Sequence, residues 1–276
     1  MSAIAVPVGR TRPGLRATGW LAVTVLGAVA ATAVLGPWLA PDDPNHADLL
    51  ASYAAPSAAH WLGTDATGRD VASRLIAGTR TALIGPAAIV ALSLLVGVPL
   101  ALAAAWRGGW AATVVGRAMD LLFAVPALLL GILAVAVAGP GLVPAVAALA
   151  IAYLPYVGRL ATAAAEAERV KPYVRALEVQ GHPALRISLR HILRNIAGPL
   201  LGQASVAFAY ALLDLAALSF LGLGVQAPDA DWGVLVNDRD ALLRGHPLGV
   251  AAAAVVIVAT VLSLFTVGSR VSGPQR

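Results

Sequence analysis

Long apolar segments separated by short polar ones dominate the pattern of this chain. Six segments have the length and composition of membrane-spanning helices, at residues 20–39, 81–105, 120–138, 141–157, 196–221 and 248–267. About 20 apolar residues suffice for a helix to cross the hydrocarbon core of a bilayer. The pattern therefore predicts an all-α integral membrane protein with six transmembrane helices.

The segments divide the chain into a tail, a first helix, a polar excursion and a five-helix core. We place these at residues 1–17, 18–40, 41–80 and 81–270, with a second tail at 271–276. Asp70 can cap a short helix through Arg80, whose apolar face we expect to lie along the membrane surface. Prolines within the spans, such as Pro126, predict kinks.

The polar segment at residues 173–195 is basic and has a helical pattern. Arg186, Arg190 and Arg194 recur every four residues, so they follow one side of a helix. Gly181 can take the positive φ that a sharp turn between two helices needs. We predict a short bent helical finger outside the bilayer. It is either a solvated basic loop or a contact element that receives motion from a soluble partner.

Composition agrees with a membrane protein, and the distribution of charge orients it. The chain is 59% hydrophobic and 12% charged, whereas soluble domains carry about 25% charged residues. With both termini inside, 14 of the 19 Lys and Arg residues fall in inner segments, as the positive-inside rule requires. The net charge of +5 is therefore assigned to topology and to anionic lipid or an acidic partner, not to nucleic acid.

Several enzymatic functions are excluded by missing residues. Lys171 is the only lysine, and its neighbours Val170 and Pro172 do not fit a phosphate-binding G-x-x-x-x-G-K-[ST] loop. The chain has no cysteine, so it has no thiolate metal site. We therefore expect no enzymatic activity, no metal site and no cofactor bound by this chain.

Asp214 is the one acidic residue that we place inside a predicted span. A carboxylate in lipid must face the bundle interior, water or a partner. It is either a proton or substrate site or a structural hydrogen-bonding group, and the absence of a second charged residue for a relay favours the structural role.

Two outer segments contain further candidates. Asp65, Arg69 and Asp70 could bind a ligand or metal, although a turn followed by a helix cap is the better reading of that sequence. Asp231 and Trp232 could form a docking point or an interfacial aromatic anchor.

Three segments together resemble one known family. They are HWLGTDATGRDVASRLIAGTRTAL at 60–83, YVRALEVQGHPALRISLRHILRN at 173–195 and ALSFLGLGVQAPDADWG at 217–233. With these segments in this order and at this spacing, the chain resembles the inner-membrane permeases of ABC importers for dipeptides, oligopeptides and nickel. The resemblance covers roughly residues 15–270. It is most similar to the second permease of each pair.

The resemblance implies a type I importer permease in a bacterial cell membrane. Such a permease works with a second permease, two cytoplasmic ATPases that bind ATP and magnesium, and an external solute-binding protein. The loop at 161–195 would then hold a coupling helix, with contacts to an ATPase through Arg175, Ala176, Glu178, Gly181, His182, Arg186 and Arg190. The resemblance assigns Asp214 and Pro126 to the translocation path or helix packing, and Asp65, Arg69, Asp70, Asp231 and Trp232 to the face for the binding protein.

The sequence also departs from the family pattern. Arg175 stands where the family usually has Glu, Leu177 replaces an Ala, and Arg194 replaces a Pro. The acid of the fifth span falls at Asp214 rather than at position 215, which turns it about 100° around a helix. Two alternatives stay open: a proton-coupled secondary transporter that uses Asp214, and a membrane scaffold that transports nothing itself.

Overall fold

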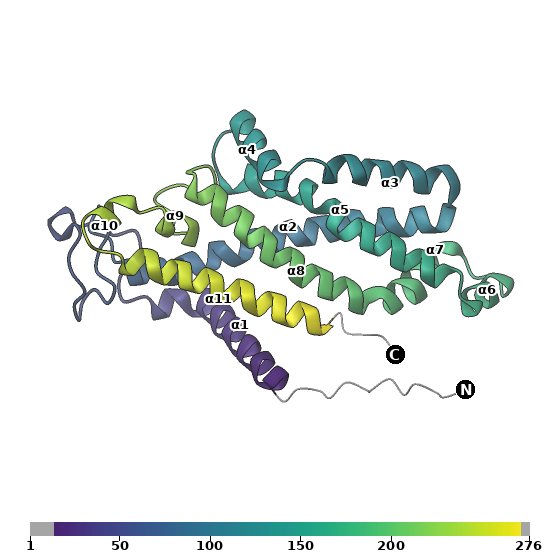
Figure 1. Cartoon of the computed structure of the whole chain (residues 1–276), viewed down its shortest axis with the longest axis horizontal. Coiled ribbons are helices and arrows are strands. Elements are labelled where there is room, and N and C mark those ends of the chain that lie inside the picture. Colours follow the sequence, from purple (N-terminus) through teal and green to yellow (C-terminus); the bar gives the residue numbers. More distant parts are fainter. Residues whose placement is uncertain (1–13, 272–276) are drawn as a thin grey trace, which may run out of the picture.

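The computed structural model describes residues 14–271, and this part of the chain is a bundle of long helices (Figure 1). No strand occurs within it. Its helices are α1 (Gly14–Leu39), α2 (Val71–Arg107), α3 (Gly109–Phe123), α4 (Ala127–Ala138), α5 (Leu142–Arg169), α6 (Pro172–Val179), α7 (Ala184–Ile187), α8 (Leu193–Phe220), α9 (Trp232–Val236), α10 (Arg239–Leu243) and α11 (Leu248–Val271).

The helices include the membrane spans that the apolar segments predict. Five are long and apolar enough to cross a bilayer: Ala17–Leu39, Val71–Arg107, Leu142–Arg169, Ala184–Phe220 and Leu248–Val271. The pair α3 and α4 makes a sixth span if its two halves are counted together. The all-α membrane fold is therefore confirmed. The predicted tails lie largely outside the described residues.

The third span is broken rather than continuous. The sequence predicts one helix at residues 120–138, whereas α3 and α4 meet at an angle of 79°. Pro126 lies at the break, with φ −55° and ψ 132°. Proline cannot donate a backbone hydrogen bond and disfavours helical geometry in the residue before it, so it ends one helix and precedes the next.

The surface helix predicted to follow Asp70 is instead the first part of α2. Val71 and Ala72 are buried, and the helix continues through Pro86 and Pro99 to Arg107. The prediction of a helix along the membrane surface is therefore wrong, because packing inside the bundle buries its apolar face. The predicted cap is confirmed, since the Asp70 side chain accepts a hydrogen bond from the Ser73 amide.

The central core lies between α2, α5 and α8. Ile89, Leu149, Leu215 and Leu218 are buried there in one apolar cluster. The Ser93 hydroxyl donates a hydrogen bond of 2.8 Å to the Ala150 carbonyl and joins α2 to α5. Small residues permit this close approach of helix backbones.

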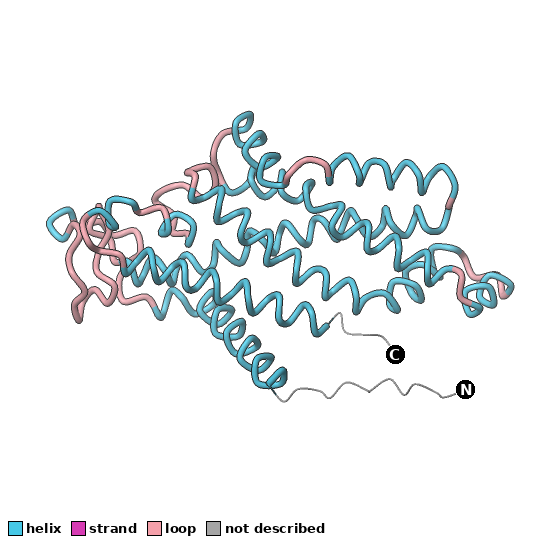
Figure 2. The backbone as a smooth tube through the Cα atoms, viewed as in Figure 1, coloured by secondary structure: helices cyan, strands magenta, loops and turns pink. Residues whose placement is uncertain are grey.

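The two longest helical segments extend beyond the thickness of a bilayer. α2 and Ala184–Phe220 each contain 37 residues, which corresponds to about 55 Å against a hydrocarbon core of about 30 Å. Most loop residues gather at the end of the bundle that holds α9 and α10, and the opposite end carries the turn around α6 and α7 (Figure 2). The finger therefore projects from one end of the bundle.

Candidate functional site

The finger is a helix–turn–helix element, as its sequence predicts. Pro172 begins α6 at a position that suits its fixed φ, and Gly181 adopts a φ of 78°. The His182 amide donates a 3.1 Å hydrogen bond to the Leu177 carbonyl and closes the turn. Beyond Pro183 the chain continues through α7 and a π-helix at Ser188–Ile192 into α8.

Apolar side chains fix the finger to the bundle. Val174, Ile187 and Ile192 are almost completely buried and share a cluster with residues of α2 and α5, such as Ala101 and Val157. The finger also runs into α8 through a helical connection with no intervening loop. A force on the finger would thus reach α2, α5 and α8 through packed side chains.

A hydrogen-bonded carboxylate fastens the base of the finger. Glu168 accepts a hydrogen bond from the Lys171 ammonium, one of 2.7 Å from the Tyr173 hydroxyl and one of 3.2 Å from the Asn195 amide. Burial, with the bond to Glu168, raises the pKa of Tyr173 to about 12. This Glu168 cluster joins the end of α5 to the starts of α6 and α8.

The sequence analysis missed Glu168. Its only signal was an acid near the end of an apolar segment, and nothing local indicated a bond to Asn195, which is 27 residues away.

The outer side of the finger is cationic and partly apolar. Arg175, Arg186, Arg190 and Arg194 are exposed, and none forms an ion pair within residues 17–271. Ala176 and Gly181 are exposed, and His182 is half-buried. Glu178 instead lies 3.6 Å from Arg169, whose guanidinium stacks over Trp106.

An apolar groove of about 220 Å³ lies beside the finger, lined by Leu102 and Trp106 from α2 and by Leu185 and Leu189 from α7 and the π-helix. Leu185 is 70% exposed. The finger therefore offers exposed positive charge, and an apolar groove lies where it meets α2.

The two residues assigned to the path or to helix packing lie in different surroundings. Asp214 is half-buried and accepts a 2.8 Å hydrogen bond from the Tyr153 hydroxyl of α5. The next residue, Leu215, belongs to the core and is 2% exposed. Pro126 is exposed at the break between α3 and α4.

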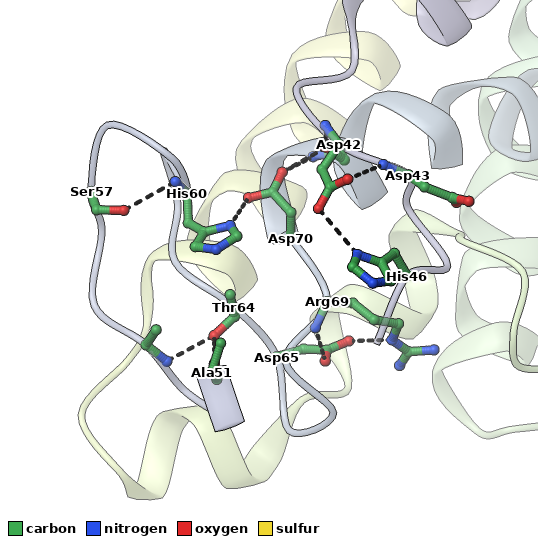
Figure 3. Close-up of polar contacts among 12 residues, drawn as sticks. Asp42, Asp43, His46, Ala51, Ser57, His60, Thr64, Asp65, Arg69 and Asp70 are labelled. Carbon is green, nitrogen blue, oxygen red and sulfur yellow. Dashed lines mark hydrogen bonds and ion pairs between the residues drawn. The ribbon is translucent and has the colours of Figure 1, made fainter. Parts of the chain in front are cut away.

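The first outer loop is held by buried acids (Figure 3). The Asp65 carboxylate accepts hydrogen bonds from the amides of Thr67 and Arg69 and from Arg69 Nε at 2.8 Å. Burial opposes ionisation of Asp65, but these hydrogen bonds hold its pKa below the usual value. Asp70 Oδ1 lies 3.1 Å from His60 Nδ1. Asp70 Oδ2 accepts a hydrogen bond from the Ser73 amide.

The second outer loop is fastened to α2. Asp231 caps α9 by accepting a 2.8 Å hydrogen bond from the Gly233 amide, and burial raises its pKa. Trp232 Nε1 donates a 3.0 Å hydrogen bond to the Leu75 carbonyl. Arg74, which the sequence analysis did not single out, donates from Nη1 to the Pro44 and Pro228 carbonyls at 3.0 and 3.2 Å.

These contacts change the interpretation of the outer residues. Four of them are less than 9% exposed: Asp65, Asp70, Asp231 and Trp232. The fifth, Arg69, forms an ion pair with Asp65. Their burial leaves almost no surface for a docked protein, so their side chains hold the two loops together. The interpretation of Asp65 to Asp70 as a turn and cap agrees with this geometry.

Replacing Trp232 with Phe tests the bond between the second loop and α2. The change keeps an aromatic ring but removes the donor to Leu75. We expect a loss of about 1 kcal/mol in stability, seen as a lower Tm of the purified protein in detergent. Trp61→Phe is the matched control, because Trp61 is 59% exposed. Equal Tm values for both variants would contradict the role of Trp232.

Comparison with known proteins identifies the class. Residues 97–272 match the family described as binding-protein-dependent transport system inner membrane component. The chain belongs to this family. It is a multi-pass inner-membrane component of a binding-protein-dependent transport system, and its relatives are transport permeases rather than enzymes.

Several curated relatives are similar over most of the chain. It is 38% identical over 86% of its length to the probable D,D-dipeptide transport system permease protein DdpC of Escherichia coli, covering 80% of that protein. It is 41% identical over 77% of its length to the di/tripeptide transport system permease protein DppC of Pseudomonas aeruginosa, covering 72%. It is 32% identical over 90% of its length to the nickel transport system permease protein NikC of Escherichia coli, covering 90%.

Proposed function

We propose that this chain is the second permease of a paired, ATP-driven importer and forms half of its translocation pore. Its substrate would be a di- or oligopeptide or a related small solute such as nickel, as the names of its relatives suggest. A second permease, two cytoplasmic ATPases holding ATP and magnesium, and an external binding protein would complete the transporter. Both termini would lie in the cytoplasm.

The finger is the single observation that supports this proposal most strongly. Its inner side is packed on α2 and α5 and its end is continuous with α8, while its outer side carries Arg175, Ala176, Gly181, Arg186 and Arg190. The exposed part is suited to a cleft on an ATPase. Closure of the ATPase dimer would push the finger, and the rigid helices behind it would move the pore between inward-open and outward-open states.

The external binding protein would meet the exposed residues of the two outer loops. Leu50 is 99% exposed and Leu243 is 85% exposed, so these loops have apolar surface available. The buried side chains of Asp70 and Trp232 would keep both loops at the N-terminal end of α2. A docked protein would then act on the N-terminal end of α2, and the C-terminal part of the same helix contacts the finger.

Reconstitution with the three other kinds of subunit tests this function. Proteoliposomes that hold the complete transporter should take up substrate only with ATP and loaded binding protein, and an uncoupler should have no effect. Uptake that stops with an uncoupler but not after ATP depletion would favour a proton-coupled transporter. Purification without any ATPase would favour a scaffold.

A further inference from the structure

An aromatic cluster crosses the bundle beside Asp214. The rings of Tyr153 and Tyr156 stack with centroids 5.2 Å apart, and Tyr210 of α8 lies 6.2 Å from Tyr156. Phe123 of α3 and Phe265 of α11 extend the cluster at 5.3 and 5.2 Å from Tyr156 and Tyr210. Three of the five tyrosines of the chain gather here.

The carboxylate at this cluster has no cationic partner. Tyr153 donates a hydrogen bond to Asp214 Oδ2, and no Lys, Arg or His within residues 17–271 forms an ion pair with Asp214. Asp214 Oδ1 accepts no hydrogen bond from the described residues. It is not among the buried atoms that lack a partner, and the side chain is only half-buried. A carboxylate at membrane depth requires a polar or positive partner, and here one oxygen remains free to meet it.

The cluster lies within the candidate membrane spans and reaches the surface of the chain. Asp214 is six residues from the end of α8 at Phe220 and Tyr210 is ten residues from it, or about 9 and 15 Å along the helix. The helical segment Ala184–Phe220 that carries both residues is long and apolar enough to cross a bilayer. Tyr210 is 42% exposed, so part of the cluster lies at the surface of the chain.

The surrounding groups select among cations. A divalent metal prefers several oxygen or nitrogen ligands, and within the described residues no group of three or more His, Cys, Asp or Glu side chains could hold one. An ammonium group instead needs one carboxylate and benefits from aromatic faces within about 6 Å. One acid among three tyrosines therefore matches an organic ammonium better than a metal ion.

We propose that Asp214, Tyr153, Tyr156 and Tyr210 form a subsite that holds the protonated amino group of a peptide during its passage. This inference rests on the proposed function and adds the chemical class of the substrate to it. Asp214 supplies the counter-charge, Tyr153 orients the carboxylate, and the rings of Tyr156 and Tyr210 border the ammonium. The counter-charge lowers the cost of moving an ammonium group through a bundle built mainly of apolar side chains.

The test uses the complete transporter in proteoliposomes, saturated with loaded binding protein and supplied with radiolabelled alanyl-alanine. Asp214→Asn should lower the rate of uptake roughly tenfold or more, because it removes the charge that pairs with the ammonium. ATP hydrolysis stimulated by the loaded binding protein should remain, because the finger is unchanged. Asp120→Asn is the control: this exposed acid of α3 forms a surface ion pair with Arg159, and uptake should stay near the wild-type rate.

A purely structural role for Asp214 gives a different result. Uptake and stimulated ATP hydrolysis would then fall together with the amount of assembled complex, or neither would change, and both results would overturn the subsite. If Asp214→Asn does not assemble, Tyr156→Phe and Tyr156→Leu decide the question. The ring-retaining Phe variant should transport several times faster than the Leu variant at equal assembly, and equal rates would count against the subsite.

The wild-type transporter separates failure of this inference from failure of the proposed function. If it takes up Ni²⁺ but no alanyl-alanine, the ammonium subsite is wrong and ATP-driven import stands. If ATP drives uptake of no solute that its binding protein carries, the proposed function itself is wrong. Uptake of alanyl-alanine that depends on Asp214 supports both.

Discussion

Gly181→Arg is expected to abolish ATP-driven uptake while the chain still inserts into the membrane. Gly181 is exposed at the turn of the finger with a φ of 78°, and beyond its chain neighbours no heavy atom lies within 4 Å of a Cβ added there. The substitution therefore leaves the packed bundle intact and places a large cation on the surface proposed to enter an ATPase. Coupling between sites typically amounts to about 5–150-fold in affinity, and a loss at the top of that range is expected.

Gly181→Ala separates backbone strain from bulk. Both variants must adopt a φ that disfavours any side chain, at a cost of about 1 kcal/mol, but only Arg fills the space around the turn. Uptake and ATP hydrolysis in proteoliposomes should be nearly normal for Ala and lost for Arg. If the two variants are equally impaired, strain is the cause and the contact with an ATPase is not established. Normal uptake by Gly181→Arg would refute the coupling role of the finger.

Glu168→Ala is the second change for which we expect a large effect. It removes the acceptor shared by Tyr173, Asn195 and Lys171, so the base of the finger would be held only by its apolar contacts and by the continuous helix into α8. A hydrogen bond to a charged group contributes about 1.5–3 kcal/mol. We expect uptake per ATP hydrolysed to fall about 5-fold or more, because a finger that is held less firmly passes less of the motion of the ATPases to α5.

Lys171→Ala is the matched control for Glu168→Ala. It removes only the cationic partner of the same carboxylate and keeps the bonds from Tyr173 and Asn195. Exposed ion pairs contribute about 0–1 kcal/mol, so the ratio of uptake to ATP hydrolysis should remain close to the wild-type value. A ratio that is unchanged in Glu168→Ala, measured at equal amounts of assembled transporter, would show that the cluster does not transmit motion.

The exposed arginines explain how the finger can differ from the usual family pattern. Arg175 stands where the family usually has an acid, and it is exposed with no ion-pair partner in the described part of the chain. The interior of the finger does not depend on this position, because Val174 and Ile187 supply the buried contacts. A change at position 175 would therefore be matched on the ATPase surface rather than within the permease.

The sequence was a good guide wherever a local pattern carries the information. Apolar segment length predicted the spans, since a bilayer sets the length of a helix. Gly181 predicted the turn and Asp70 the helix cap, because positive φ and capping depend on a few neighbouring residues. The three ordered segments also identified the permease family. The break at Pro126 was expected only as a kink, since sequence does not give the angle between two half-helices.

Only the tertiary structure decided which polar residues belong together. Glu168 meets Asn195 and Tyr153 meets Asp214 across 27 and 61 residues of sequence, and neither pairing has a local signal. The burial of Asp231 and Trp232 against α2 was likewise hidden in a loop that appeared suited to docking. The physical reason is that span length, turns and caps are set by neighbouring residues, whereas burial and hydrogen-bond partners are set by how distant helices pack.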